Sequence, residues 1–81
     1  MSVYDIIDAA ADAGASEGTP TKTVEIDLAA FEVSGDGVPP YIATVTDIYR
    51  ASVAAKARVG AQDGKMMVDF VEKKATVTFI Y

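Results

Sequence analysis

The chain has 81 residues, enough for one small domain, and its formal net charge is −5 at neutral pH. It contains no cysteine and no histidine. A disulfide, a Ser-His-Asp or Cys-His catalytic site and a histidine-ligated metal are therefore excluded. No window approaches the ~20 apolar residues that a membrane-spanning helix needs, and the acidic balance is unfavourable for binding nucleic acid.

The first element that the sequence predicts is a helix over residues 2–13. Ser2 and Asp5 have the spacing of a capping box, with the aspartate in place of the usual glutamate. Four apolar residues then recur at the spacing of one helical face: Val3, Ile6, Ile7 and Ala10. Gly14 is expected to end the helix.

A flexible connection is expected next, because the segment 14–22 (GASEGTPTK) has the composition of a loop. We expect a single domain over residues 1–81, in which residues 1–13 can act as a helical arm joined by this loop. An arm that leaves its own core would use its apolar face for contact with other subunits. Ile6 and Ile7 are therefore candidate interaction residues.

The segment from Thr23 to Leu28 alternates apolar and polar residues, which is the pattern of a half-buried strand. At Ala29–Ala30 the alternation slips by one position, and apolar residues continue to Val33. A β-bulge would produce such a slip. The turn-rich run SGDGVPP at 34–40 is expected to end the strand.

Residues 41–61 fit two structures. As a helix over about 44–59, they form one apolar stripe with spacings of four and three: Tyr41, Val45, Ile48, Ser52, Ala55 and Val59. Pro40 suits the first helical position and Gly60 suits the end. As a strand, nearly all odd-numbered positions are apolar, and residues 42–48 are rich in β-branched side chains. We favour the helix and keep the strand as the alternative.

The last third of the chain predicts a hairpin, because two runs of strand-forming residues, 65–71 and 75–81, flank Glu72-Lys73-Lys74. The chain stops on the apolar sequence TVTFIY, and such a strand would be a sticky edge if it frayed. We expect it to be paired, either within the monomer or by strand addition to a neighbouring subunit. This makes the terminal residues further interaction candidates: Phe79, Ile80 and Tyr81.

Together these elements predict an α+β fold. The N-terminal helix is followed by a small, mostly antiparallel sheet with a second helix packed on one face. If residues 41–61 form a strand instead, the alternative is a mainly β fold.

Charge is distributed unevenly along the chain. Residues 1–40 carry eight acidic side chains and one lysine, whereas residues 41–81 carry six basic and four acidic side chains. Either the two halves neutralise each other within a monomer, or neighbouring copies attract head to tail. Asp5, Asp8 and Asp12 lie close on one helical face, but without a calcium-loop motif they predict a solvated surface.

No motif in the sequence predicts a catalytic, cofactor or metal site, so we expect that the protein is not an enzyme. The core is small and has no disulfide or structural metal to stabilise it. This predicts a structural subunit that forms a homo-oligomer or docks onto other protein subunits, such as a capsid or tail accessory protein of a virus or phage. The alternative is a small acidic binding module, such as an inhibitor or antitoxin, that caps a basic partner. We expect no nucleic-acid or membrane partner, and a cytoplasmic location, or the virion if the protein is viral.

Overall fold

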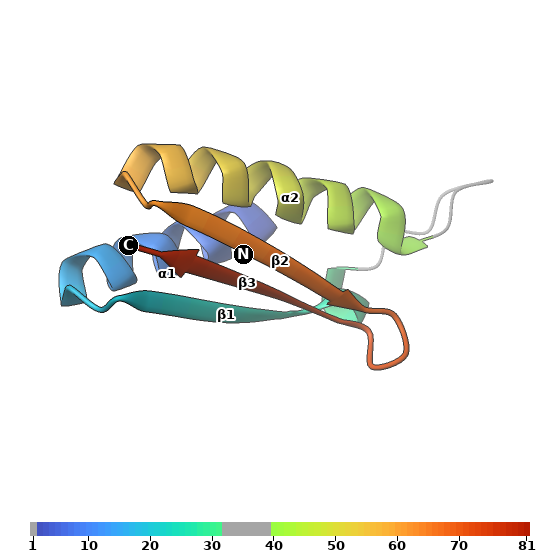
Figure 1. Ribbon diagram of the computed structural model, residues 1–81. Helices are drawn as coiled ribbons and strands as arrows, with labels where there is room; N and C mark the ends of the chain where they lie inside the picture. Colours follow the sequence, from blue (N-terminus) through green and yellow to red (C-terminus); the bar gives the residue numbers. More distant parts are fainter. Residues whose placement is uncertain (1, 32–39) are drawn as a thin grey trace.

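The fold is a three-stranded antiparallel sheet with two helices on one face (Figure 1). The computed structural model describes residues 2–31 and 40–81, with side chains at 2–30 and 44–81. Its elements in chain order are α1 (Val3–Glu17), β1 (Thr21–Asp27), the 3₁₀ turn η1 (Leu28–Phe31), α2 (Pro40–Val59), β2 (Asp63–Asp69) and β3 (Lys74–Ile80). The strand order is β1-β3-β2. The predicted α+β fold is thus confirmed.

Helix α1 begins as predicted and ends later. Ser2 Oγ accepts a hydrogen bond from the Asp5 N–H, and an Asp5 carboxylate oxygen accepts from the Ser2 N–H, both at 3.2 Å. The helix passes through Gly14 and ends at Gly18, which has a φ of +67°. Most of the predicted loop at 14–22 is therefore helix or strand, and only three residues connect α1 to β1. The prediction failed because Gly14 serves close packing rather than a helix end.

Strand β1 ends in η1, so the predicted bulge at Ala29–Ala30 was wrong. The Leu28 N–H donates to the Lys73 carbonyl at 2.9 Å, and the Asp27 carboxylate accepts from the Ala29 N–H at 3.0 Å. An aspartate that binds the backbone two residues on favours a turn over an extended chain. The predicted continuation of the strand is therefore wrong as far as Phe31, which belongs to η1, and its last part, up to Val33, lies outside the described residues.

Helix α2 settles the ambiguity of residues 41–61 in favour of the helix. It has 20 residues and ends at Gly60, whose φ is +70°. Ile48 and Ala55 of the predicted stripe are fully buried, and Ser52 is nearly so. The helix prevails because this stripe covers the sheet, whereas the other side of the segment remains exposed.

The C-terminal hairpin is confirmed, and β3 lies at its centre. Phe79 of β3 pairs with Lys22 of β1 on one side and with Gly64 of β2 on the other. The terminal strand therefore finds its pairing within the monomer, the first of the two predicted possibilities. Three side chains of β3 are fully buried beneath the helices: Ala75, Val77 and Phe79. The core is thus built on the last strand of the chain.

Candidate functional site

The predicted interaction residues lie on different parts of the molecule. Ile7 and Phe79 are fully buried in the core, and Ile6 packs against that core while remaining partly exposed. Ile80 is half-buried on the opposite face of the sheet, because it follows the inward-pointing Phe79. The structure therefore does not bring these side chains together into one surface. Helix α1 lies against α2 and β1, and its release as an arm stays a prediction.

Tyr81 connects the end of the chain to α1. Its hydroxyl donates a hydrogen bond to the Ala11 carbonyl at 2.7 Å, and its ring packs beside Gly14. Burial raises the pKa of the Tyr81 hydroxyl above its ordinary value of 10.0, with further contributions from the negative charges of Asp12 and Glu17. The neutral hydroxyl is thus the form that the folded protein favours.

We expect the protein to lose stability as the pH rises above 10. Because the pKa of Tyr81 is raised in the folded state, the unfolded chain gives up this proton first, and its ionisation favours unfolding. The stabilisation is complete below pH ~10 and is lost as the pH rises through the folded-state pKa. Urea melts between about pH 8 and pH 11 measure this loss, which Tyr81→Phe should reduce.

The Tyr81→Phe variant is the critical comparison for this prediction. Tyr4, whose pKa is also raised by burial and by Asp47, is retained in both proteins and provides a common background. Parallel pH profiles for the wild type and Tyr81→Phe would contradict the assignment to Tyr81.

Ion pairs connect the acidic first half of the chain to the more basic second half. Arg58 of α2 contacts Asp12 at 2.7 Å and Asp8 at 3.4 Å, both on α1. Lys74 of β3 contacts Glu25 of β1 at 3.3 Å. These pairs favour neutralisation within the monomer over attraction between copies. All of these pairs are exposed and contribute little to stability. The main effect of the two Arg58 pairs is to reduce the negative charge of the α1 surface.

The acidic residues of α1 have partners other than a metal ion. Asp5 belongs to the capping box, and Asp8 and Asp12 bind Arg58. No group of three acidic side chains suited to a metal ion occurs in the part of the chain that the structure describes. Within that part, neither helix is long and apolar enough to cross a membrane.

Strand β2 has a free edge, because no strand of the described ranges pairs with its outer side. The hydrogen bonding of β3 shows which backbone groups of β2 face this edge. The Lys73 carbonyl and the Tyr81 N–H both bond to the β1 side. Since backbone groups alternate in direction along a strand, the odd-numbered residues of β3 face β1 and the even-numbered ones face β2.

The backbone groups at the free edge belong to three residues of β2. The even-numbered residues of β3 pair with the odd-numbered residues of β2, so Gly64, Met66 and Val68 direct their N–H and C=O groups outward. The Asp63 carboxylate accepts from the Gly64 N–H at 2.8 Å and thereby closes one end of the edge. The edge around Met66 and Val68 stays open to another strand.

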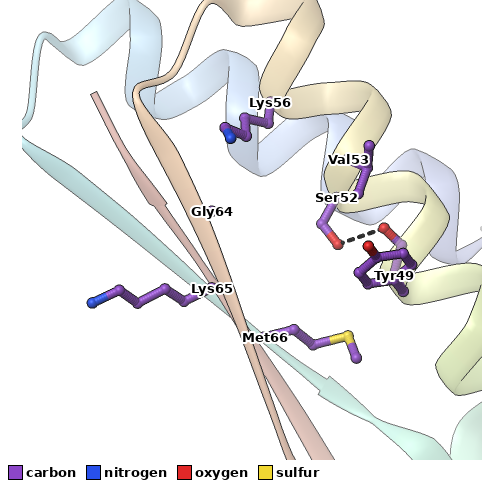
Figure 2. A pocket seen from close by; sticks show the side chains of 7 residues that line it. All are labelled: Tyr49, Ser52, Val53, Lys56, Gly64, Lys65 and Met66. Atoms are coloured by element: carbon purple, nitrogen blue, oxygen red, sulfur yellow. Dashed lines mark hydrogen bonds between the residues drawn. The ribbon is translucent and has the colours of Figure 1, made fainter.

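An apolar groove of about 230 Å³ lies between α2 and this edge (Figure 2). Seven residues line it: Tyr49, Ser52, Val53, Lys56, Gly64, Lys65 and Met66. Met66 points toward α2, whereas Lys65 points away from it, as the alternation of a strand requires. Tyr49 and Val53 are 59% and 51% exposed, so the groove presents apolar surface to solvent. The hydroxyl of Ser52 donates to the backbone carbonyls of Ile48 and Tyr49 in its own helix, so it is satisfied without a ligand.

The sequence interpretation missed the free edge of β2, although the sequence carries one signal of it. Met66 and Met67 are adjacent, so one methionine must face the helices and the other must face outward. Met67 is 74% exposed on the uncovered face of the sheet. Its apolar side chain is therefore one that a second chain at this edge could cover.

Comparison with known proteins found no matching family model, no similar curated protein and no similar solved structure. The functional interpretation therefore rests on the geometry of this chain alone.

Proposed function

We propose that this protein is a non-enzymatic structural subunit that assembles with copies of itself or with other protein subunits in a larger complex, such as a virus or phage particle. The observation that carries this proposal is the free edge of β2 beside the groove of Tyr49 and Val53. An open strand edge next to exposed apolar side chains is a template for pairing with another chain.

The chemistry of the chain supports an assembly role over catalysis. With no histidine or cysteine, acid–base or nucleophilic catalysis would depend mainly on carboxylates, lysines or hydroxyls. Asp8, Asp12 and Glu25 are each held in an ion pair with a basic residue. The groove of about 230 Å³ contains lysines but no acidic partner for them. This arrangement suits binding to an apolar surface better than activation of a substrate.

The acidic binding module has weaker support. Its working surface would be the acidic first half of the chain, where Arg58 already neutralises part of α1. The two functions differ in solution: an assembly subunit associates with itself, whereas a capping module stays monomeric until a basic partner is added. Sedimentation velocity over a range of protein concentrations separates them.

We expect Val53→Asp to weaken association without unfolding the protein. Val53 is 51% exposed, so a charge there costs the folded monomer little, but a partner seated in the groove would have to bury that charge. The wild type should sediment with an apparent mass above the 8.5 kDa of a monomer, and the apparent mass of the variant should return toward that value. Thermal melts of the two proteins should agree at concentrations low enough for both to be monomeric.

Ala54→Asp is the matched control for this prediction. It places the same charge on the neighbouring exposed residue of α2, outside the groove. A wild type that is monomeric at every concentration would overturn the self-assembly proposal. Equal effects of the two variants would show that the groove is not the contact.

A further inference from the structure

We infer that the partner of the β2 edge is a second copy of this chain, which adds its own β2 antiparallel about a two-fold axis at Met67. This inference rests on the proposed assembly function and specifies how the copies meet. The product would be one continuous six-stranded sheet, with strand order β1-β3-β2-β2-β3-β1 across the two copies. Closed two-fold contacts are the commonest way in which identical chains associate.

The backbone allows only a few registers for such a contact. Met66 and Val68 direct their hydrogen-bonding groups outward, so they must face outward-directed residues of the second copy. A two-fold axis at Met67 places Met66 opposite Val68 of the second copy, and Val68 opposite its Met66. Each of these two pairs can exchange both N–H to C=O bonds. If the axis fell between two residues, outward-directed groups would stand opposite inward-directed groups. No hydrogen bonds could then form between the two copies.

Charge selects among the registers that remain. With the axis at Lys65, this lysine would stand opposite itself, and with the axis at Met66, Asp63 would stand opposite Asp69 of the second copy. Like charges directly opposite each other destabilise a strand pair. With the axis at Met67, Lys65 of each copy stands opposite Asp69 of the other copy. The exposed Met67 side chains of the two copies stand opposite each other. This register pairs opposite charges and buries an apolar side chain between them.

The local structure of Asp69 leaves it able to accept this lysine. One of its carboxylate oxygens accepts from the Val71 and Glu72 N–H groups at 3.0 and 3.1 Å and thereby orders the hairpin turn. The other oxygen takes no part in these two bonds, and we expect it to accept Lys65 of the second copy. The carboxylate is thus positioned before association, which lowers the entropic cost of the contact.

The same axis accounts for the exposed side chains above the sheet. A two-fold axis perpendicular to the sheet keeps the helices of both copies on one face. Tyr49 and Val53 line the groove next to Met66, so they would lie over the joint and face their counterparts. Three exposed apolar side chains near this edge, Met67, Tyr49 and Val53, would then be covered by one contact.

The register is tested by the substitution Met67→Cys. The chain has no cysteine, so the new thiol is the only one present. Directly opposed residues of a non-hydrogen-bonded pair have Cα atoms ~4.5 Å apart, which lies within the range that a disulfide spans. In a glutathione redox buffer we expect a covalent dimer by intact mass. Thr76→Cys, beside Met67 on the uncovered face of the neighbouring strand β3, is the matched control, because its copy would lie roughly 14 Å away across three strand spacings.

The charges are tested separately by Lys65→Glu. At two places in the dimer this substitution would put a carboxylate opposite Asp69 of the other copy. We therefore expect the dimerisation affinity to weaken at least about tenfold. Lys22→Glu makes the same change in net charge on β1, at the other edge of the sheet, and should leave dimerisation unchanged. Circular dichroism checks that each variant is folded, which matters for Lys22→Glu because Lys22 is half-buried and pairs with Glu17 at 3.5 Å.

The outcomes separate this inference from the proposal on which it rests. If the wild type assembles but Met67→Cys forms no more covalent dimer than Thr76→Cys, the proposed register is overturned and the assembly function stands. If the wild type stays monomeric at every concentration, self-assembly is overturned together with this inference, and only docking onto other subunits is left of the proposed function. Preferential cross-linking through Met67→Cys, together with weakened dimerisation of Lys65→Glu, establishes the contact.

Discussion

Deletion of Phe79–Tyr81 is expected to abolish cooperative folding of the protein. Phe79 is fully buried in the central strand, which pairs on both sides, and Tyr81 bonds to α1. Burial of each large apolar side chain contributes roughly 1.5–3 kcal/mol, and a whole domain is stable by only about 5–15 kcal/mol. The deletion also removes hydrogen bonds from both neighbouring strands. Urea melts followed by circular dichroism should show no cooperative transition.

Two point variants separate the side chains from the backbone in this prediction. Phe79→Ala creates a cavity in the core and should cost about 3–5 kcal/mol of unfolding free energy. Ile80→Ala changes the neighbouring residue, which is half-buried on the uncovered face, and should cost much less. A truncated protein with the urea midpoint of the full chain would show that the last strand is dispensable and would contradict the central position of β3.

Gly14→Ala should destabilise the protein by about 1–3 kcal/mol, although alanine is the better helix former. A Cβ atom at this position would lie 2.4 Å from the Tyr81 hydroxyl, 2.6 Å from a ring carbon of the same tyrosine and 2.7 Å from the Cβ of Lys22. These distances are too short, so α1 would have to move away from β1 and from the chain end. Urea melts give the change in unfolding free energy.

Ala15→Gly is the reference for Gly14→Ala. It reports the intrinsic difference between the two residues at an exposed position of the same helix, expected to be ~1 kcal/mol in favour of alanine. The double variant Gly14→Ala/Tyr81→Ala removes one of the two obstacles, so part of the loss should be recovered. A stabilising Gly14→Ala would show that the contact with Tyr81 does not constrain α1.

The sequence alone indicates only part of what makes the free edge of β2 a candidate contact. The strand-forming residues of 65–71 predict a strand, which the structure places at Asp63–Asp69, and Met67 is an apolar side chain on its outer face. Alternation cannot tell whether a strand lies at the edge or the centre of a sheet, because both have the same period of two. The five predicted interaction residues were chosen for their apolar character, and two of them, Ile7 and Phe79, are apolar because they form the core.

Local patterns in the sequence determined where most elements lie. The capping box at Ser2, the alternation before Leu28 and the polar turn between the last two strands all act within a few residues, so each is visible without a fold. Tertiary structure decided the rest. Gly14 sits inside a helix because Tyr81 and Lys22 need its space, and residues 41–61 are helical because their stripe covers a sheet built later in the chain. The free edge at β2 exists because β3, the last strand, inserts between the other two, and pairing between segments distant in sequence leaves no local trace.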